Sequence, residues 1–273
     1  MNYIFELSKE QFQCVNSLLP VSEGYIEPKA VIERNNPGWV FVDSMSDPHA
    51  ALIWSQGNEG FYIFGNQIDS YAKDLNHFID IYIKPKLVNR GIKYFQISSV
   101  PPATDSELQA IFKSRKLNSW EQSVYLYRKN NMISETIPDV GCLCDINDII
   151  KKYTIKNMDF VEEKILNYWD SIDVFLAKGN GYCVLVDNTV ASLSLTGWIA
   201  ENTHEISIET VEQYRCRGFA KICSAALINK YLEQGCFPYW ECETNNTASV
   251  KLAEKLGFSK LHFYTCYGFR IAK

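Results

Sequence analysis

Short hydrophobic runs alternate with polar turns along the chain, and they fall into two clusters. The first cluster has runs at residues 38–43, 50–54 and 61–65, and the second has runs at 181–187, 190–195 and 205–210. Two apolar runs joined by a short polar turn predict a β-hairpin, and a third run extends it into an antiparallel meander. We therefore expect each half of the chain to begin its sheet in the same way.

The elements that follow each meander also share one order. A predicted helix ends before a glycine in each half, at 75–89 before Gly91 and at 219–234 before Gly235, as is typical of a helix C-terminus. A strand, a shorter helix and an aromatic strand come next, at 93–97, 105–114 and 123–127, and again at 238–242, 247–255 and 262–267. The offset of about 140 residues indicates a duplicated unit.

A polar segment separates the two copies. It runs from 128 to 148 and contains Pro138 and Gly141, which favour turns and loops. We expect an N-terminal domain at 1–130, a linker at 131–148 and a second domain at 149–273. Each domain is of ordinary size, and a hydrophobic content of 47% allows both to bury a core.

The most specific local pattern is a strand, a turn and a helix between Glu205 and Ala226. The helix has apolar residues at 219, 222, 223, 226 and 227, which form one amphipathic face. The first backbone N–H groups of a helix lack intrahelical partners, and the helix dipole makes them an anion site. Gly218 and Ala220 are small enough for a pyrophosphate to approach the backbone, and Arg215 and Arg217 add positive charge.

This turn resembles the coenzyme A signature of the GNAT superfamily, Q/R-x-x-G-x-G/A, in the form Arg215-x-x-Gly218-x-Ala220. The stretch from Asn246 to Phe258 is similar to the closing helix and terminal L-G-F of that superfamily. The resemblance covers about ninety residues well. The whole chain also resembles the zwittermicin A resistance type of GNAT acetyltransferase, through residues 205–210, 214–220, 238–242 and 252–258.

The resemblance implies an α+β (mixed α/β) fold of tandem GNAT-like domains, each a mostly antiparallel twisted sheet flanked by helices. It implies acetyl-CoA as co-substrate and no metal. The residues that it assigns to coenzyme binding are Thr210, Val211, Arg215, Cys216, Arg217, Gly218, Phe219, Ala220, Asn246 and Ser249. In the first half, residues 66–71 carry no R-x-x-G-x-G/A. We therefore expect a degenerate copy that builds one wall of the substrate cleft.

Direct transfer is the mechanism that the resemblance implies, with an amine attacking the thioester between two splayed strands. This reaction needs a base, donors for the oxyanion and an acid for the thiolate. A backbone N–H near Thr210 and Val211 is the expected oxyanion donor. Glu205 and Glu209 are the candidate bases, because their spacing places both on one strand face with Ser207.

Several alternatives stay open around these carboxylates. Glu205 and Glu209 are also compatible with solvated or cap-forming positions on a half-exposed strand, and His204 lies beside them. Glu241 and Glu243, on the next strand, fit either a grip on a cationic substrate or ordinary surface charge.

The expected acid departs from the family pattern. Ala253 stands where many members carry a Tyr. Tyr264 is therefore the candidate catalytic acid, and Tyr267 is a second candidate. The alternative is that the thiolate leaves without an acid. Asn246 and Ser249 match positions that contact the pantetheine or 3′-phosphate arm. Asn246 also suits a helix cap.

The amino-acid composition limits which binding partners we expect for the protein. A net charge of −5 without a Lys/Arg stripe argues against nucleic-acid binding. The nine Cys show no paired C-x-x-C, and the isolated Cys142-x-Cys144 is interpreted as non-metallic, in a reducing cytosol. The first residues do not predict a signal peptide, and no run reaches the ~18 apolar residues of a membrane span. We expect a cytoplasmic protein without membrane or metal.

The leading hypothesis is acetyl transfer from acetyl-CoA to a primary amine of a small molecule, such as an amine-bearing antibiotic or metabolite, by a monomer or homodimer. One alternative is a non-catalytic acyl-CoA-binding module, which would suit the missing Tyr. Another is a tandem-GNAT transferase acting on a protein or peptide amine; the lack of a basic surface argues against its aminoacyl-tRNA version.

Overall fold

The computed structural model describes residues 4–20, 24–65, 68–101, 103–129, 131–134, 141–152 and 154–272. The chain divides into two compact units. Unit 1 comprises Met1–Gln122 with Phe263–Lys273, and unit 2 comprises Ser123–His262. The last strand of the chain therefore belongs mainly to the unit that the first half builds.

Unit 1 combines a sheet with helices on both of its faces. Its elements are β1 (Phe5–Glu6), η1 (Lys9–Leu18), α1 (Ile26–Ile32), β2 (Gly38–Val42), β3 (Ala50–Ser55), β4 (Gly60–Gly65), α2 (Ile68–Phe78), η2 (Ile79–Ile83), α3 (Lys84–Asn89), β5 (Tyr94–Ser99), α4 (Asp105–Ile111), most of β6 (Asn118–Leu126) and the end of β12 (Ser259–Arg270). Strands β1 to β4 pair antiparallel in chain order. Strand β5 is parallel to β4 and antiparallel to β12.

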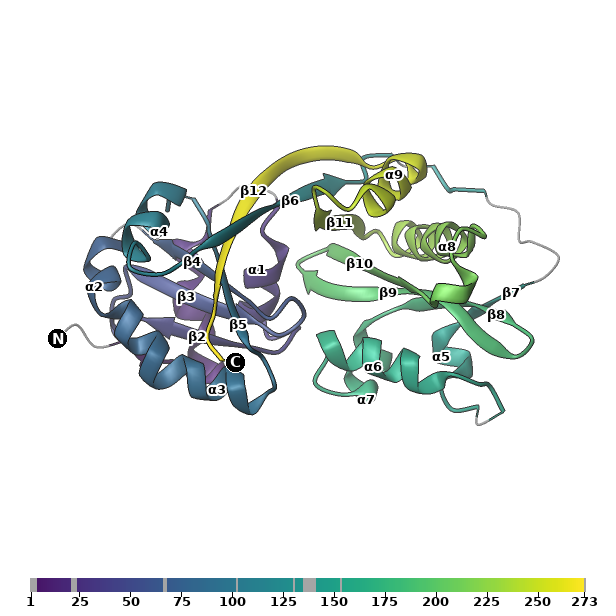
Figure 1. The fold of residues 1–273 in the computed structure, drawn as a ribbon. Coiled ribbons are helices and arrows are strands. Elements are labelled where there is room, and N and C mark those ends of the chain that lie inside the picture. Colours follow the sequence, from purple (N-terminus) through teal and green to yellow (C-terminus); the bar gives the residue numbers. More distant parts are fainter. Residues whose placement is uncertain are drawn as a thin grey trace. The chain divides into compact units, whose positions relative to one another are not determined.

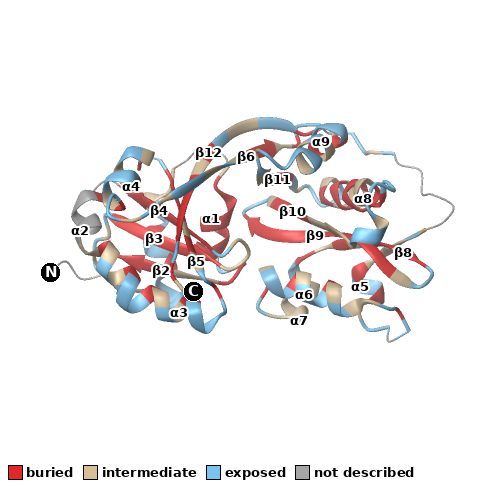
Figure 2. Ribbon diagram, in the orientation of Figure 1, coloured by how far each residue is buried: buried red, intermediate tan, exposed pale blue. Residues whose placement is uncertain are grey.

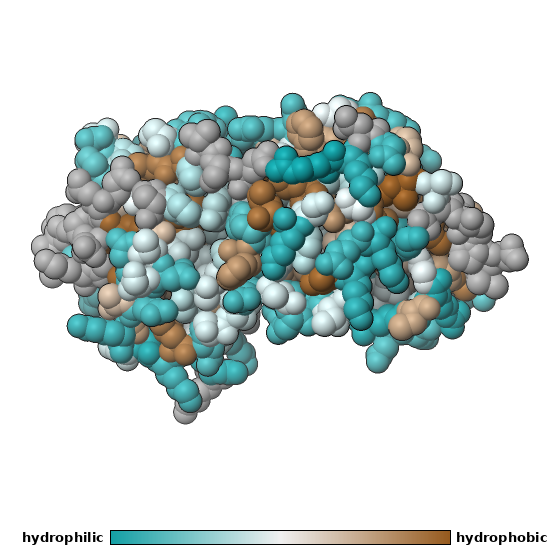
Figure 3. Space-filling model, turned by 90° about the horizontal axis from the view of Figure 1, so that it is seen from above, coloured by the Kyte–Doolittle hydropathy of each residue, from teal (hydrophilic) through white to brown (hydrophobic). Residues whose placement is uncertain are grey.

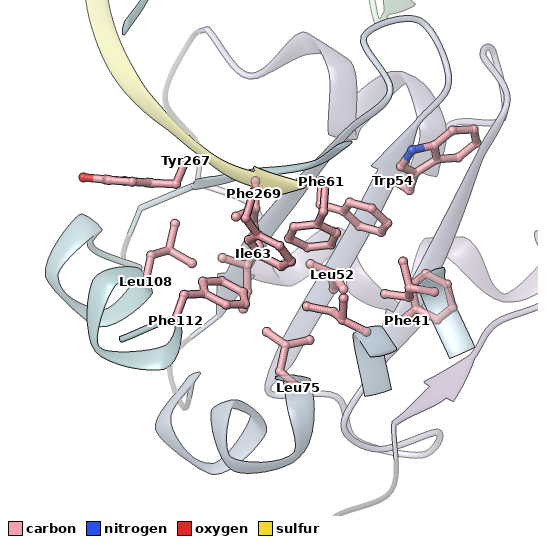
Figure 4. Close-up of a cluster of buried hydrophobic side chains, with 14 of the residues drawn as sticks. Phe41, Leu52, Trp54, Phe61, Ile63, Leu75, Leu108, Phe112, Tyr267 and Phe269 are labelled. Atoms are coloured by element: carbon pink, nitrogen blue, oxygen red, sulfur yellow. The ribbon is translucent and has the colours of Figure 1, made fainter. Parts of the chain in front are cut away.

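Aromatic residues hold the end of β12 in the core of unit 1. Phe269 stacks on Phe95, with ring centroids 5.0 Å apart, and lies 5.7 Å from Phe112 of the α4 end. Phe61 also stacks on Phe95, and Figure 4 shows Phe61, Phe112 and Phe269 gathered in one cluster. Each aromatic pair adds about 0.5–1.5 kcal/mol beyond area burial, which favours β12 in this sheet.

Unit 2 has the same succession of a meander, a helix, a strand and a shorter helix. Its elements are the end of β6, β7 (Cys142–Asp145), α5 (Ile146–Ile149), α6 (Met158–Tyr168), α7 (Ile172–Lys178), β8 (Gly181–Val186), β9 (Thr189–Ala200), β10 (Thr203–Thr210), η3 (Glu212–Tyr214), α8 (Phe219–Glu233), β11 (Phe237–Glu243), α9 (Thr247–Leu256) and the start of β12. The strand order is β6-β11-β10-β9-β8-β7.

Helices cover both faces of the unit 2 sheet (Figure 1). Helices α8 and α9 lie on one face, where Leu227 and Ala253 pack with Ile206 of β10. Helices α5, α6 and α7 lie on the other face, where Ile165 packs with Leu193 of β9. Strand β9 is buried along nearly its whole length between these layers (Figure 2). The two faces of the sheet therefore have separate neighbours.

The predicted fold class is confirmed, as a mixed α/β fold with mostly antiparallel strands. Gly91 and Gly235 have positive φ angles of 81° and 72° at the helix C-termini where glycine was expected. The predicted helix 75–89 is longer, since it begins with α2 and passes through the π-helical turn η2 into α3. Within the predicted linker 131–148, residues 135–140 lie outside the described residues, and β7 pairs with β8.

The two aromatic strands that end the halves are exchanged between the units. The backbone N–H of Tyr127 donates to the carbonyl of Pro238, and β6 neighbours β11 in unit 2. Cys266 of β12 lies opposite Ser98 of β5 in unit 1. The sequence-based domain limits at 130 and 149 therefore follow the order of the copies, whereas the compact units follow strand pairing.

Hydrophilic residues cover much of the face seen in Figure 3, with hydrophobic residues scattered among them. In the described ranges, no helix is both long and apolar enough to cross a membrane. The same ranges contain no group of three or more His, Cys, Asp or Glu that could hold a metal ion.

Candidate active site

Strands β10 and β11 start as a parallel pair and then part. Thr203, His204 and Glu205 lie opposite Phe237, Pro238 and Tyr239, and the pairing ends at Glu205. Strand β10 continues to Thr210 and β11 to Glu243. The two strands therefore open into a V, with Glu205 at its apex.

One edge of β10 faces this opening. The N–H of Val211 donates to the carbonyl of Ala191 (3.0 Å), so this amide is used by the sheet. Backbone groups alternate in direction along an antiparallel pair, and Thr210, one residue earlier, lies opposite Ser192. The amide of Thr210 therefore points away from β9 and toward the opening, as does that of Ile208.

The turn after β10 is anchored by Arg215. Its Nε donates to the carbonyl of Thr210 (3.3 Å), and its Nη2 lies 3.9 Å from Oε1 of Glu209. Arg217 lies over the ring of Tyr214, 5.4 Å from the ring centroid. Cys216 has a positive φ of 62°, and residues 215–218 are exposed. This turn presents backbone and guanidinium groups to solvent at the start of α8.

Gly218 is the residue at which the turn becomes helix α8. It has a φ of 83°, and a Cβ there would meet no atom of the described residues within 4 Å. Lys221 and Ile222 donate the first bonds of the helix, to the carbonyl of Gly218. Within the described residues no side chain caps this end, and its first turn carries no acidic residue. The amides of Phe219 and Ala220 thus form an electropositive, open end that suits a phosphate.

Glu205 occupies a β-bulge between β9 and β10. His204 lies opposite Ile199 and Ile206 opposite Thr196, so Gly197 and Trp198 together face Glu205. A Cβ at position 197 would overlap Oε2 of Glu205, which means that glycine provides the space for the carboxyl group.

Burial strongly perturbs the acidity of Glu205. The residue is 4% exposed, and no described residue forms a hydrogen bond with its Oε2. Desolvation and the nearby Glu241 carboxylate raise the pKa of Glu205 to about 8, against the opposing effects of Lys164 and the Trp198 N–H. A carboxylate with a pKa near neutrality, at the apex of an open V, is suited to accept a proton.

Comparison with known proteins places this geometry in a family. A family model described as GNAT acetyltransferase matches residues 21–267. The chain belongs to the GNAT acetyltransferase family. A curated relative, the uncharacterized N-acetyltransferase YdfB of Bacillus subtilis (strain 168), is 29% identical over 269 residues, which cover 98% of this chain and 99% of YdfB.

Solved structures share the fold of this GNAT acetyltransferase. A GCN5-related N-acetyltransferase-like protein from Streptococcus suis 89/1591 has a TM-score of 0.66 at 20% identity, covering 94% of this chain and 98% of its own. A tandem GNAT protein from the clavulanic acid biosynthesis pathway has a TM-score of 0.58 at 8% identity, covering 99% of both chains. At these identities the likeness concerns the fold alone.

The GNAT sheet brings the predicted carboxylates to one face of β10. Ser207 donates to the hydroxyl of Tyr168 (3.2 Å), and Glu209 Oε2 lies 3.6 Å from Lys164 Nζ. Both partners are on α6, so Glu205, Ser207 and Glu209 face α6. His204 instead contacts the ring of Tyr231 on α8, and burial lowers its pKa to about 4.

The predicted coenzyme residues of the closing helix have structural partners. The Asn246 side chain caps α9 by accepting from the N–H of Ser249 (3.1 Å). The Ser249 hydroxyl accepts from the indole N–H of Trp240 (3.0 Å). The capping interpretation of Asn246 is therefore confirmed, and a coenzyme contact by either residue stays a prediction.

The predicted acid, Tyr264, lies in unit 1. It is 9% exposed, and its ring centroid is 6.2 Å from that of Tyr25. Tyr267 is also in unit 1, where its hydroxyl accepts from Gln109 (2.9 Å). The acid role of Tyr264 stays a prediction.

Among the described residues, unit 1 shows neither an opening between two splayed strands nor a turn like that before α8. Strand β4 pairs with β5 through Ile63 opposite Ser99, where β5 ends. Helix α2 begins at Ile68, soon after β4 ends at Gly65. The short connection leaves no length for a turn like that of residues 211–218.

Sequence reasoning missed the surroundings of Glu205. Lys164 and Tyr168 come from α6, far from residue 205 along the chain, and Gly197 lies across the bulge on β9. The glycine inside strand β9 was the one available signal, because such a glycine often marks a bulge or a close approach.

Proposed function

We propose that this GNAT acetyltransferase transfers the acetyl group of acetyl-CoA to a primary amine of a small molecule by direct attack on the thioester. The observation that carries the proposal is the buried, unpartnered Oε2 of Glu205 at the apex of the β10/β11 opening. Glu205 would then act as a base in the opening between β10 and β11, the place where the resemblance to GNAT acetyltransferases implies that the thioester lies.

Coenzyme binding is assigned to the turn and the start of α8. The exposed residues 215–218 and the uncapped amides of Phe219 and Ala220 suit the pyrophosphate. The amides of Ile208 and Thr210, which point into the opening, suit the extended pantetheine arm and the thioester oxygen. Val211 is a poorer oxyanion donor than the sequence suggested, since Ala191 already accepts from its N–H.

Glu205 is assigned as the general base. The ammonium form of the acceptor must lose a proton before its nitrogen can attack. Transfer to a carboxylate with a pKa of about 8 is less unfavourable than transfer to one with the ordinary value of 4.5. The amine nitrogen then bonds to the acetyl carbon, the carbon–sulfur bond breaks, and the thiolate takes a proton.

The finer assignments are part of the proposal. The resemblance to the zwittermicin A resistance type favours an amine-bearing antibiotic or metabolite as acceptor. All nine cysteines are free, which supports a reducing, cytoplasmic location.

An acetyl-transfer assay over an amine panel tests the function. Purified protein with acetyl-CoA is expected to acetylate at least one class of primary amine, with free thiol released in equal amount. Glu205→Gln is expected to lower kcat/KM by about 10² to 10⁴. Thiol release that is independent of any amine, or a Glu205→Gln variant with full activity, would contradict the proposal.

A further inference from the structure

The face of the opening that carries Glu205 is lined by acidic side chains from both strands. On β10, Glu205, Ser207 and Glu209 share the α6 face. On β11, Tyr239 lies level with Glu205, and side chains two residues apart project to the same face of a strand. Glu241 and Glu243 therefore extend the acidic face outward from the apex.

Glu241 is held in a defined position on this face. The Tyr239 hydroxyl donates to Glu241 Oε2 (2.7 Å), and Tyr239 itself is only 1% exposed. A hydrogen bond from a buried residue fixes the carboxylate, in contrast to Glu243, which is exposed at the strand end.

The local charge balance around the apex is negative. Glu241 contributes more to the raised pKa of Glu205 than Lys164 does to lowering it. Lys164 is also shared with Glu209, at 3.6 Å. Two neighbouring carboxylates, one of them with an unpartnered buried oxygen, form a site that a cation would stabilise.

We propose that the acceptor carries a second cationic nitrogen and that Glu241 binds it while the reactive nitrogen lies at Glu205. The inference rests on the proposed function and adds the substrate class, a diamine or polyamine-like molecule. Glu241 is then a specificity-determining residue.

The strand geometry sets the distance between the two nitrogens. Glu241 lies two residues beyond the level of Glu205, about 7 Å along the strand, and on the neighbouring strand, about 5 Å across the sheet. The two offsets combine to about 8 Å, and each ~1.5 Å bond of an extended zigzag chain advances it by about 1.25 Å, so roughly five or six methylene groups separate two nitrogens by this distance. The acceptor is therefore a molecule whose amino groups are spaced like those of 1,5-diaminopentane or 1,6-diaminohexane.

The test compares kcat/KM for a diamine with that for a monoamine of equal carbon chain. Linear α,ω-diamines from ethylenediamine to 1,8-diaminooctane and the matched n-alkylamines are the probes. For the native enzyme we expect a diamine preference of at least about tenfold, which corresponds to the free energy of one charged contact, with its maximum at five or six methylene groups.

Glu241→Gln and Glu243→Gln form the matched pair of variants. The ratio of diamine to monoamine kcat/KM cancels any effect of Glu241 on the Glu205 base. We expect Glu241→Gln to bring this ratio close to one and Glu243→Gln to leave it within about twofold of the native value.

The possible results distinguish a failure of the diamine inference from a failure of the proposed acetyltransferase function. Acetylation of monoamines as efficiently as diamines overturns the inference and leaves the function standing. An unchanged ratio in Glu241→Gln, or an equal loss in Glu243→Gln, removes the assignment to Glu241. Failure to acetylate any amine contradicts the proposed function itself.

Discussion

The carboxyl group of Glu205 lies against the α-carbon of Gly197, in the space that any side chain at position 197 would fill. The two residues face each other across the bulge between β9 and β10. This contact allows a charged residue to be buried at the apex of the strand opening. It links a backbone irregularity directly to the proposed catalytic base.

Replacing Gly197 with Ala is expected to displace the Glu205 carboxyl group. A misplacement of about 1 Å can lower catalytic rate by about 10²-fold, so kcat should fall while coenzyme affinity stays near native. Steady-state kinetics and coenzyme titration measure the two effects. A variant that binds coenzyme and turns over normally would show that the contact has no catalytic importance.

Gly218→Glu is expected to abolish coenzyme binding, because a carboxylate would then stand beside the uncapped amides of α8. Like-charge repulsion of several kcal/mol corresponds to a loss of about 100-fold or more in affinity. Gly235→Glu is the matched control: Gly235 follows the other end of the same helix, also has a positive φ, and also has no atom within 4 Å of its Cβ position. Equal affinity of the two variants would remove the site assignment.

The pH profile should report the ionisation of Glu205. Since the base must be deprotonated, kcat/KM is expected to rise with pH and to level off above the pKa of about 8. Glu205→Gln should lose this inflection. An inflection that survives in Glu205→Gln would remove Glu205 as the base.

Stability should depend on pH through the same group. The pKa of Glu205 rises from its ordinary 4.5 to about 8 on folding, so the folded state keeps a proton that the unfolded state releases. Stability is then expected to fall between about pH 4.5 and 8, by at most about 1.4 kcal/mol per pH unit. Urea unfolding of Glu205→Gln across this window should show a smaller fall. Parallel curves would argue that the carboxyl group is solvated.

Two variants of Asn246 distinguish its role as the cap of α9 from a contact with the coenzyme. Asn246→Ala is expected to cost about 1 kcal/mol of stability, because it removes the cap of α9. Asn246→Asp keeps a capping oxygen and adds a negative charge, so its stability should stay near native. Reduced coenzyme affinity in Asn246→Asp alone would reveal a contact with a phosphate, and native affinity in both variants would limit Asn246 to capping.

The local elements and the turn before α8 were predictable from the amino-acid sequence alone. Short apolar runs joined by polar turns predicted the strands of both meanders, and the small residues Gly218 and Ala220 between Arg215 and a helix marked the proposed anion site. These features depend on residues close together in the chain, so local sequence is sufficient to specify them.

Which aromatic strand completes which sheet depends on tertiary packing. Residues 123–127 and 262–267 have similar patterns, and each would fit either sheet as far as local sequence shows. The exchange depends on packing partners such as Phe95 and Phe112 for Phe269, which are distant in sequence.

The acidity of Glu205 was likewise set by tertiary contacts. Its raised pKa comes from burial between β9 and α6 and from Glu241 on the next strand. Desolvation and Coulomb repulsion act through space, so a linear pattern could nominate Glu205 and Glu209 equally. Only the folded sheet distinguishes the buried carboxylate at the apex from the ion-paired one near the turn.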